Sequence, residues 1–129
     1  MIRKIAYWAS TIVVAALLGM ALSYLTGSPQ VVEGFNHVGY PQHLRIVLGV
    51  AKPLAAVVLL LPGLPLLKEW AYAGAAFALS MAFLAHWHAG DGATSFMPLA
   101  PLALLVVSYV TRPASRRLPV ATVSPQPSM

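Results

Sequence analysis

Residues 5–25 read IAYWASTIVVAALLGMALSYL, an uncharged and mostly apolar run that directly follows Arg3 and Lys4. An α-helix rises about 1.5 Å per residue, so about 20 apolar residues are needed to cross the hydrocarbon layer of a bilayer. The run has that length, and it stops at the helix-breaking residues 26–29, which read TGSP. This segment therefore predicts a membrane-spanning helix, with lipid as the solvent of the fold.

The composition of the whole chain agrees with that prediction. Of 129 residues, 59% are hydrophobic and only 9% are charged, and the mean hydropathy is +0.77. A water-soluble domain carries about 25% charged residues. The formal net charge of +5 comes from basic residues that lie mostly at the ends of apolar runs, a pattern typical of membrane topology rather than of nucleic-acid binding. The absence of cysteine excludes disulfides, thiol catalysis and thiolate metal sites.

Three further apolar runs predict three further spanning helices. The second extends from about Pro41 to Leu61 and is interrupted by Lys52-Pro53, the third from about Trp70 to His86, and the fourth from about Phe96 to Val110. The expected fold is therefore all-α, a transmembrane four-helix bundle.

The first outer loop also carries a helical pattern. Ser28-Pro29 is a typical helix start, and apolar residues then recur on one side as far as Val38. We expect a short amphipathic helix over Pro29–His37 at the outer mouth of the bundle. Residues 1–117 then form a single four-span membrane domain, and residues 118–129 a disordered cytoplasmic tail.

The basic residues predict the orientation, because positive charge next to a span tends to stay in the cytoplasm. With four spans, both ends of the chain share one side with most of the basic residues, namely Arg3, Lys4, Lys68, Arg112, Arg116 and Arg117. The expected location is a bacterial cytoplasmic (inner) membrane, with both termini cytoplasmic. An alternative is that residues 1–23 are a secretory signal peptide, but their apolar run exceeds the roughly 7–15 residues of such a segment.

Lys52 is the residue that points most directly to a function. An ammonium inside a membrane helix costs about 2.5–3.5 kcal/mol and needs compensation. Arg45 lies two helical turns earlier on the same face, and Glu33 and His37 belong to the outer loop. With His86, which ends a stripe of small residues, these side chains predict a polar ligand-binding pocket. The alternative is that Lys52 extends to the membrane interface and binds nothing.

Other chemistry is not indicated. No nucleophile motif, phosphate loop or dinucleotide fingerprint is present, so the catalytic residues are unknown and an autonomous enzyme is not predicted. The histidines do not predict a metal site, because His86 and His88 lie about 200° apart on a helix. The role of the run His86-Trp87-His88 stays open.

Several short motifs resemble the DoxX-like family of small bacterial four-helix membrane proteins. They are residues 32–35 (VEGF), 39–41 (GYP), 48–52 (LGVAK), 61–63 (LPG) and 67–74 (LKEWAYAG). The resemblance covers about residues 5–117. Members are similar to the small membrane subunit of a thiosulfate:quinone oxidoreductase, which implies a quinone-linked redox setting. The match makes Lys52 and the motif 67–74 family positions without making them catalytic.

The expectation for function combines this resemblance with the intramembrane charge. It is an accessory or membrane-anchor subunit of a quinone-linked redox system, with a quinone as the candidate cofactor, and with the lipid bilayer and a membrane or peripheral redox protein as partners. A non-catalytic scaffold or assembly factor and a small-molecule transporter are the alternatives. The sequence leaves the ligand, the partner and a homo-oligomeric state open.

Overall fold

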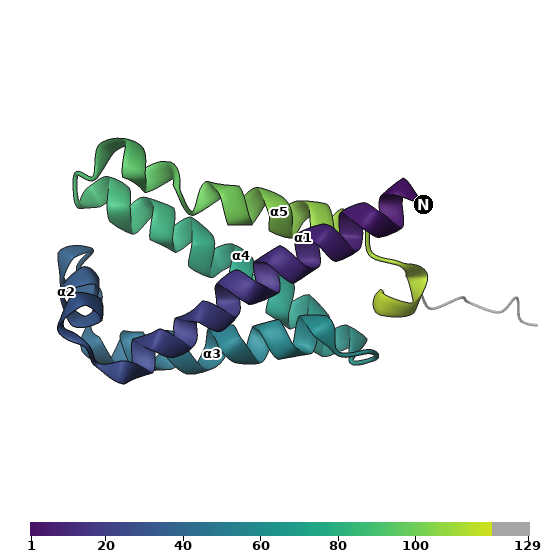
Figure 1. Cartoon of the computed structure of the whole chain (residues 1–129), viewed down its shortest axis with the longest axis horizontal. Coiled ribbons are helices and arrows are strands. Elements are labelled where there is room, and N and C mark those ends of the chain that lie inside the picture. The colour runs from purple at the N-terminus through teal and green to yellow at the C-terminus, as the bar shows by residue number, and fades with distance from the viewer. Residues whose placement is uncertain (120–129) are drawn as a thin grey trace, which may run out of the picture.

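The computed structural model describes residues 1–119, whose regular structure is entirely helical, so the all-α prediction is confirmed for this part of the chain (Figure 1). The α-helices are α1 (Ile2–Gly19), α2 (Pro29–His37), α3 (Gln42–Leu60), α4 (Pro65–His88) and α5 (Leu99–Val110). Three 3-10 segments join them, η1 (Met20–Thr26), η2 (Gly92–Phe96) and η3 (Ala114–Arg116). Of the predicted tail, 118–129, all but the first two residues lie outside the described part of the chain.

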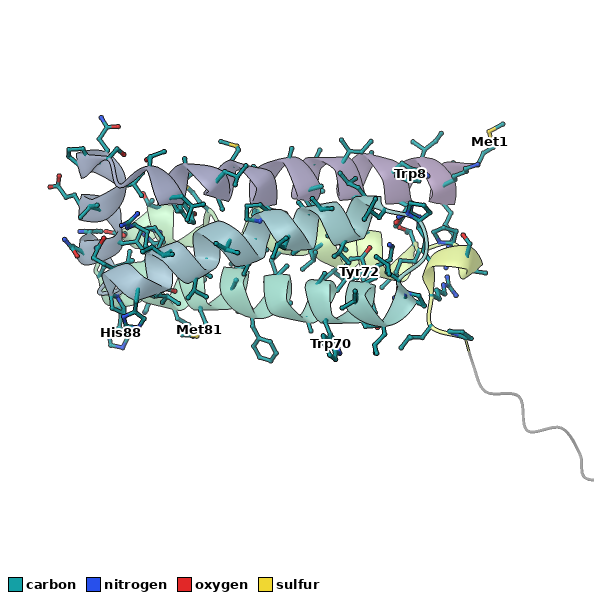
Figure 2. The ribbon with its side chains drawn as sticks, turned by 90° about the horizontal axis from the view of Figure 1, so that it is seen from below. Met1, Trp8, Trp70, Tyr72, Met81 and His88 are labelled. Carbon is teal, nitrogen blue, oxygen red and sulfur yellow. The ribbon has the colours of Figure 1, made fainter. Side chains whose placement is uncertain are left out.

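The four long helices run lengthwise and form a bundle (Figures 1 and 2). α1 packs against α3 and α5, and α4 packs against the same two helices. Met1 and η3 lie at one end of the molecule, which we call the terminal end, and α2 lies at the opposite end, the α2 end (Figure 1). At the terminal end Arg3 Nη2 donates a hydrogen bond to the carbonyl oxygen of Val110, at 3.0 Å.

Among residues 1–119, three helical stretches are long and apolar enough to cross a membrane, namely Ile2–Thr26, Gln42–Leu60 and Gly92–Val110. They correspond to the first, second and fourth predicted spans. α4 contains the third, but it is longer than predicted. Large apolar side chains are exposed on the outside of the bundle, with Phe77 of α4 73% exposed. Exposed apolar surface of this extent is rare on water-soluble proteins. It is the kind of surface that contacts lipid.

The interior combines a small apolar core with a buried set of hydrogen-bonded hydroxyl groups, which we call the hydroxyl chain. Val14, Leu18, Leu59 and Leu105 are among the buried core residues. Beside them, the hydroxyl of Ser108 on α5 lies 2.5 Å from Thr11 Oγ1 on α1 and 2.6 Å from the hydroxyl of Tyr72 on α4. Figure 2 shows Tyr72 inside the bundle, whereas Trp70 and Met81 of the same helix project outward. Hydrogen bonds thus join three helices where apolar burial alone does not discriminate between packings.

Two buried cations hold the terminal end together. The last carbonyl groups of a helix have no partner within that helix. Lys68, which is 1% exposed, donates to three carbonyl oxygens at and beyond the end of α3, those of Val58, Leu61 and Gly63. Arg116 of η3 donates to the carbonyl oxygens of Leu59 and Leu60. The end of α3 is therefore capped by side chains from α4 and from the segment that follows α5.

The segment between η1 and α3 covers the α2 end. α2 begins at Pro29 with Ser28 at the N-cap position, and glycines with positive φ, Gly27 and Gly39, lie on either side of it. Its one buried residue is Phe35, whose ring packs edge-on against Tyr24 of η1 with 4.9 Å between ring centroids. α2 thus packs onto η1 and α3 and closes this end of the bundle.

Candidate ligand-binding site

A cavity of about 260 Å³ lies beneath α2, and we call it the Lys52 cavity. Its walls come from η1, α2, α3 and α4 and from the turn between α2 and α3. The lining includes Tyr24, Phe35, Tyr40, Lys52, Ala82 and His86. Small side chains of α4 leave the space open, because Ala78, Ala82 and Ala85 line it. The arrangement is a mostly apolar pocket with a few polar groups directed into it, which is the usual character of a small-molecule site.

Lys52 forms no hydrogen bond or ion pair with any residue of the described chain, 1–119. Its Nζ atom lies over the ring of Tyr24, at 5.3 Å from the ring centroid. A cation over an aromatic face gains roughly 0.5–2 kcal/mol, which offsets only part of the cost of placing an ammonium in a membrane. The three N–H donors of Lys52 are therefore available to a ligand.

A second hollow of about 350 Å³ continues from the cavity along α3 and α4, and we call it the apolar groove. Leu48, Lys52 and Ala78 line both spaces, so the two adjoin. Toward the terminal end the groove is lined by Leu54, Leu67, Trp70 and Gly74, and Lys52 is the one charged residue among its described walls. A ligand with a polar head and an apolar tail would match this arrangement, with its head in the Lys52 cavity and its tail in the apolar groove.

A carboxylate joins two histidines, one of which, His86, lines the cavity. Asp91, in the turn between α4 and η2, lies with Oδ1 2.5 Å from Nε2 of His37 and with Oδ2 2.5 Å from Nδ1 of His86. The hydrogen bonds from His86 and then from His37 hold the pKa of the Asp91 carboxyl below its usual value of 3.8. We call this group the His37–Asp91–His86 bridge, and it connects α2 to the end of α4.

The five predicted site residues are distributed unevenly. Lys52 and His86 line the same cavity, whereas His37 does not line it and is joined to His86 through Asp91. Arg45 donates instead to the carbonyl oxygen of Tyr24 and, at 2.8 Å, to Gln42 Oε1, so it fastens α3 to η1. Glu33 is exposed on α2 and does not line the cavity.

Sequence reasoning missed three contributors. Tyr24 and Tyr40 were not predicted as site residues, yet both line the cavity. Burial raises the pKa of the Tyr40 hydroxyl, so that it stays protonated. Asp91 was not predicted either, because its two partners, His37 and His86, lie 54 and 5 residues away in the sequence. Nothing in the spacing distinguishes His37 and His86 as its partners from His43 and His88.

A family model described as the DoxX-like family matches residues 8–108. The matched region contains the Lys52 cavity and the His37–Asp91–His86 bridge. No match to this chain was found among curated proteins or among solved structures.

Proposed function

Because this chain belongs to the DoxX-like family, we propose that it is a membrane subunit of a quinone-linked redox system, and that it binds a quinone at the Lys52 cavity. The quinone ring occupies the cavity, and its apolar tail lies in the apolar groove. The observation that carries the proposal is the position of Lys52. The Lys52 ammonium, which has no hydrogen-bonding partner in the described chain, lies where the cavity with its few polar groups adjoins the apolar groove. A quinone carbonyl oxygen would accept a hydrogen bond there.

The proposal includes four membrane crossings, with α4 as the third. Two features support this count. The N-terminus and η3 lie at the same end of the molecule, as an even number of crossings requires (Figure 1). That end also carries most of the basic residues, including Lys68, Arg112 and Arg116, which favours a cytoplasmic terminal end in a bacterial inner membrane.

The redox partner is a separate protein in this proposal. The chain supplies a lipid-embedded binding site, and the electrons are handled by a partner subunit at the membrane surface. The chain therefore acts as an accessory or anchoring subunit rather than as an enzyme on its own.

The test uses the purified protein in detergent and a short-chain benzoquinone. The quinone should raise the melting temperature of the wild type, and Lys52→Met should lose most of that increase while keeping the helical content. Lys4→Met is the matched control, because Lys4 is exposed at the terminal end, away from the cavity. A wild type whose melting is unchanged by the quinone would eliminate the proposal.

Fluorescence gives a second readout of the same site. The chain has three tryptophans, and Trp70 lines the apolar groove whereas Trp87 does not. In a variant that keeps only Trp70, quinone should quench the emission in a saturable way. A variant that keeps only Trp87 should show weaker, unsaturated quenching, and equal quenching of the two would place the ligand outside the groove.

A scaffold or assembly factor is the second candidate, and one observation favours it. A side chain built at Gly19 of α1 would meet nothing within 4 Å, so this small residue leaves room for another helix. A scaffold predicts that partner co-purification survives Lys52→Met and fails in Gly19→Leu. A quinone-binding subunit predicts loss of quinone binding in the first variant only.

A further inference from the structure

The His37–Asp91–His86 bridge determines which ring nitrogen of His86 carries the proton. An ionised carboxylate only accepts hydrogen bonds, so each ring nitrogen that faces Asp91 must carry a hydrogen. The lowered pKa of Asp91 keeps it ionised at neutral pH. The proton of a neutral His86 is therefore on Nδ1, the atom 2.5 Å from Asp91 Oδ2.

The other ring nitrogen of His86 is then an acceptor. With Nδ1 protonated, Nε2 of a neutral imidazole carries a lone pair. His86 lines the Lys52 cavity, and no residue within 1–119 donates a hydrogen bond to its Nε2. Lys52 of α3 lines the same cavity and carries only donors. The cavity therefore presents donors from α3 and an acceptor from α4.

This pairing distinguishes the two redox forms of a quinone-type ligand. The oxygens of a hydroquinone are hydroxyl groups, which both donate and accept, so they satisfy Lys52 and His86 together. The oxygens of the oxidised form only accept, and one of them would meet the lone pair of Nε2. The hydroxyl groups of Tyr24 and Tyr40 rotate to donate or to accept, so they suit either form.

We propose that Asp91 is a positioning residue which, by fixing the proton of His86 on Nδ1, makes the Lys52 cavity prefer the hydroquinone over the quinone. The inference rests on the proposed function and adds the redox form of the ligand. Asp91 acts through His86 and does not touch the ligand.

Binding of both redox forms to the purified protein tests the inference. A decyl-tailed benzoquinone and its hydroquinone, kept reduced under argon, are titrated separately against the wild type, Asp91→Asn and Glu33→Gln. The absence of cysteine makes this practical, because no thiol is present to add to the quinone. Glu33→Gln is the matched control, since it removes an exposed carboxylate of α2 that does not line the cavity.

The wild type should bind the hydroquinone about tenfold more tightly than the quinone, the ratio expected from one correctly paired hydrogen bond. Asp91→Asn should bring that ratio close to one, and Glu33→Gln should leave it unchanged. Equal binding of both forms by the wild type, or a ratio unchanged in Asp91→Asn, would overturn the inference and leave the quinone site intact. Binding of neither form would overturn the proposed function itself.

Nitrogen NMR of ¹⁵N-histidine-labelled protein reads the proton position without any ligand. The signal absent from His86→Gln identifies His86. It should show a protonated Nδ1 in the wild type, with the proton moving toward Nε2 in Asp91→Asn. A wild-type His86 protonated on Nε2 would overturn the inference whatever the binding data show.

Discussion

The ammonium of Lys68 donates a hydrogen bond to the carbonyl oxygen of Val58 across 2.7 Å, so the first turn of α4 caps the last turn of α3. Two more carbonyl oxygens beyond the end of α3, those of Leu61 and Gly63, accept from the same nitrogen. A single buried side chain thus satisfies three acceptors that the helix itself leaves without partners.

Lys68→Met should therefore destabilise the protein, because it keeps the length of the side chain and removes all three hydrogen bonds. We expect a loss of about 1–3 kcal/mol in unfolding free energy, measured by denaturant titration in mixed micelles. Lys4→Met, at an exposed position of the same end, should change the unfolding free energy by less than about 0.5 kcal/mol. Equal effects of the two substitutions would contradict the capping role.

Ser108 should be energetically coupled to Tyr72. Ser108→Ala leaves the buried hydroxyls of Thr11 and Tyr72 without the partner they share, which should cost about 1–3 kcal/mol. Tyr72→Phe alone should also destabilise. The double variant should lose less than the sum, with a coupling of at least about 0.5 kcal/mol, in the same denaturant titration.

Ser80→Ala is the control for that cycle, since Ser80 Oγ bonds only to the carbonyl oxygen of Ala76 in its own helix. It should show little coupling to Tyr72→Phe. Strict additivity of Ser108→Ala and Tyr72→Phe would mean that the hydroxyl chain contributes nothing as a unit.

Gly49 should tolerate an added side chain less well than Gly74 does. A Cβ atom at this position of α3 would lie 2.8 Å from Leu25 Cδ2 and 3.2 Å from Tyr24 Cβ, because η1 packs directly onto the helix. The methyl end of Leu25 can move aside, whereas Tyr24 Cβ is fixed to the backbone, so Gly49→Ala should be less stable than Gly74→Ala by about 1 kcal/mol. Gly74→Ala is the matched control, since its Cβ would meet nothing within 4 Å, and it should be neutral in thermal unfolding.

The Asp91 carboxylate should contribute stability at neutral pH that is lost in acid. Its pKa in the folded protein is lowered by the hydrogen bonds from His86 and His37, so the contribution is complete above the unfolded value. It is lost as the pH falls through the lowered value, below 3.8. The melting temperature of the wild type should therefore exceed that of Asp91→Asn at neutral pH.

That difference should shrink as the pH falls below 3.8 and the wild-type carboxyl takes up its proton. Thermal unfolding at a series of pH values measures it. A difference that keeps growing as the pH falls below 3.8 would mean that the bridge does not lower the pKa of Asp91.

The lengths of the apolar runs were enough to predict where the long helices lie, because a bilayer fixes the length of a crossing segment. The start of the second predicted span at Pro41 and the end of the fourth at Val110 are close to those of α3 and α5. The small residues were less informative. A Cβ atom added at Gly19 or Gly74 would meet nothing within 4 Å, whereas one added at Gly49 would meet η1 closely. Composition reveals small residues, but it does not reveal which of them faces a neighbouring helix.

The candidate site was predictable only in part, because the sequence does not show which residues the fold brings into contact. Lys52 stood out because a charge in an apolar run is costly wherever the helix packs. The partners of the other polar residues depend on tertiary contacts over long sequence separations. Arg45 bonds to a carbonyl group 21 residues away, and Glu69, which could have been a surface charge of the turn, pairs with Arg112.

The apolar groove opens on the outside of α3 and α4, where Leu54 is 59% and Trp70 is 65% exposed. A hydrophobic compound can then enter the groove laterally from the hydrocarbon core of the bilayer, without passing through water. Its effective concentration is set by how strongly it partitions into the bilayer. A site supplied in this way stays filled even when each molecule is held only weakly and leaves quickly.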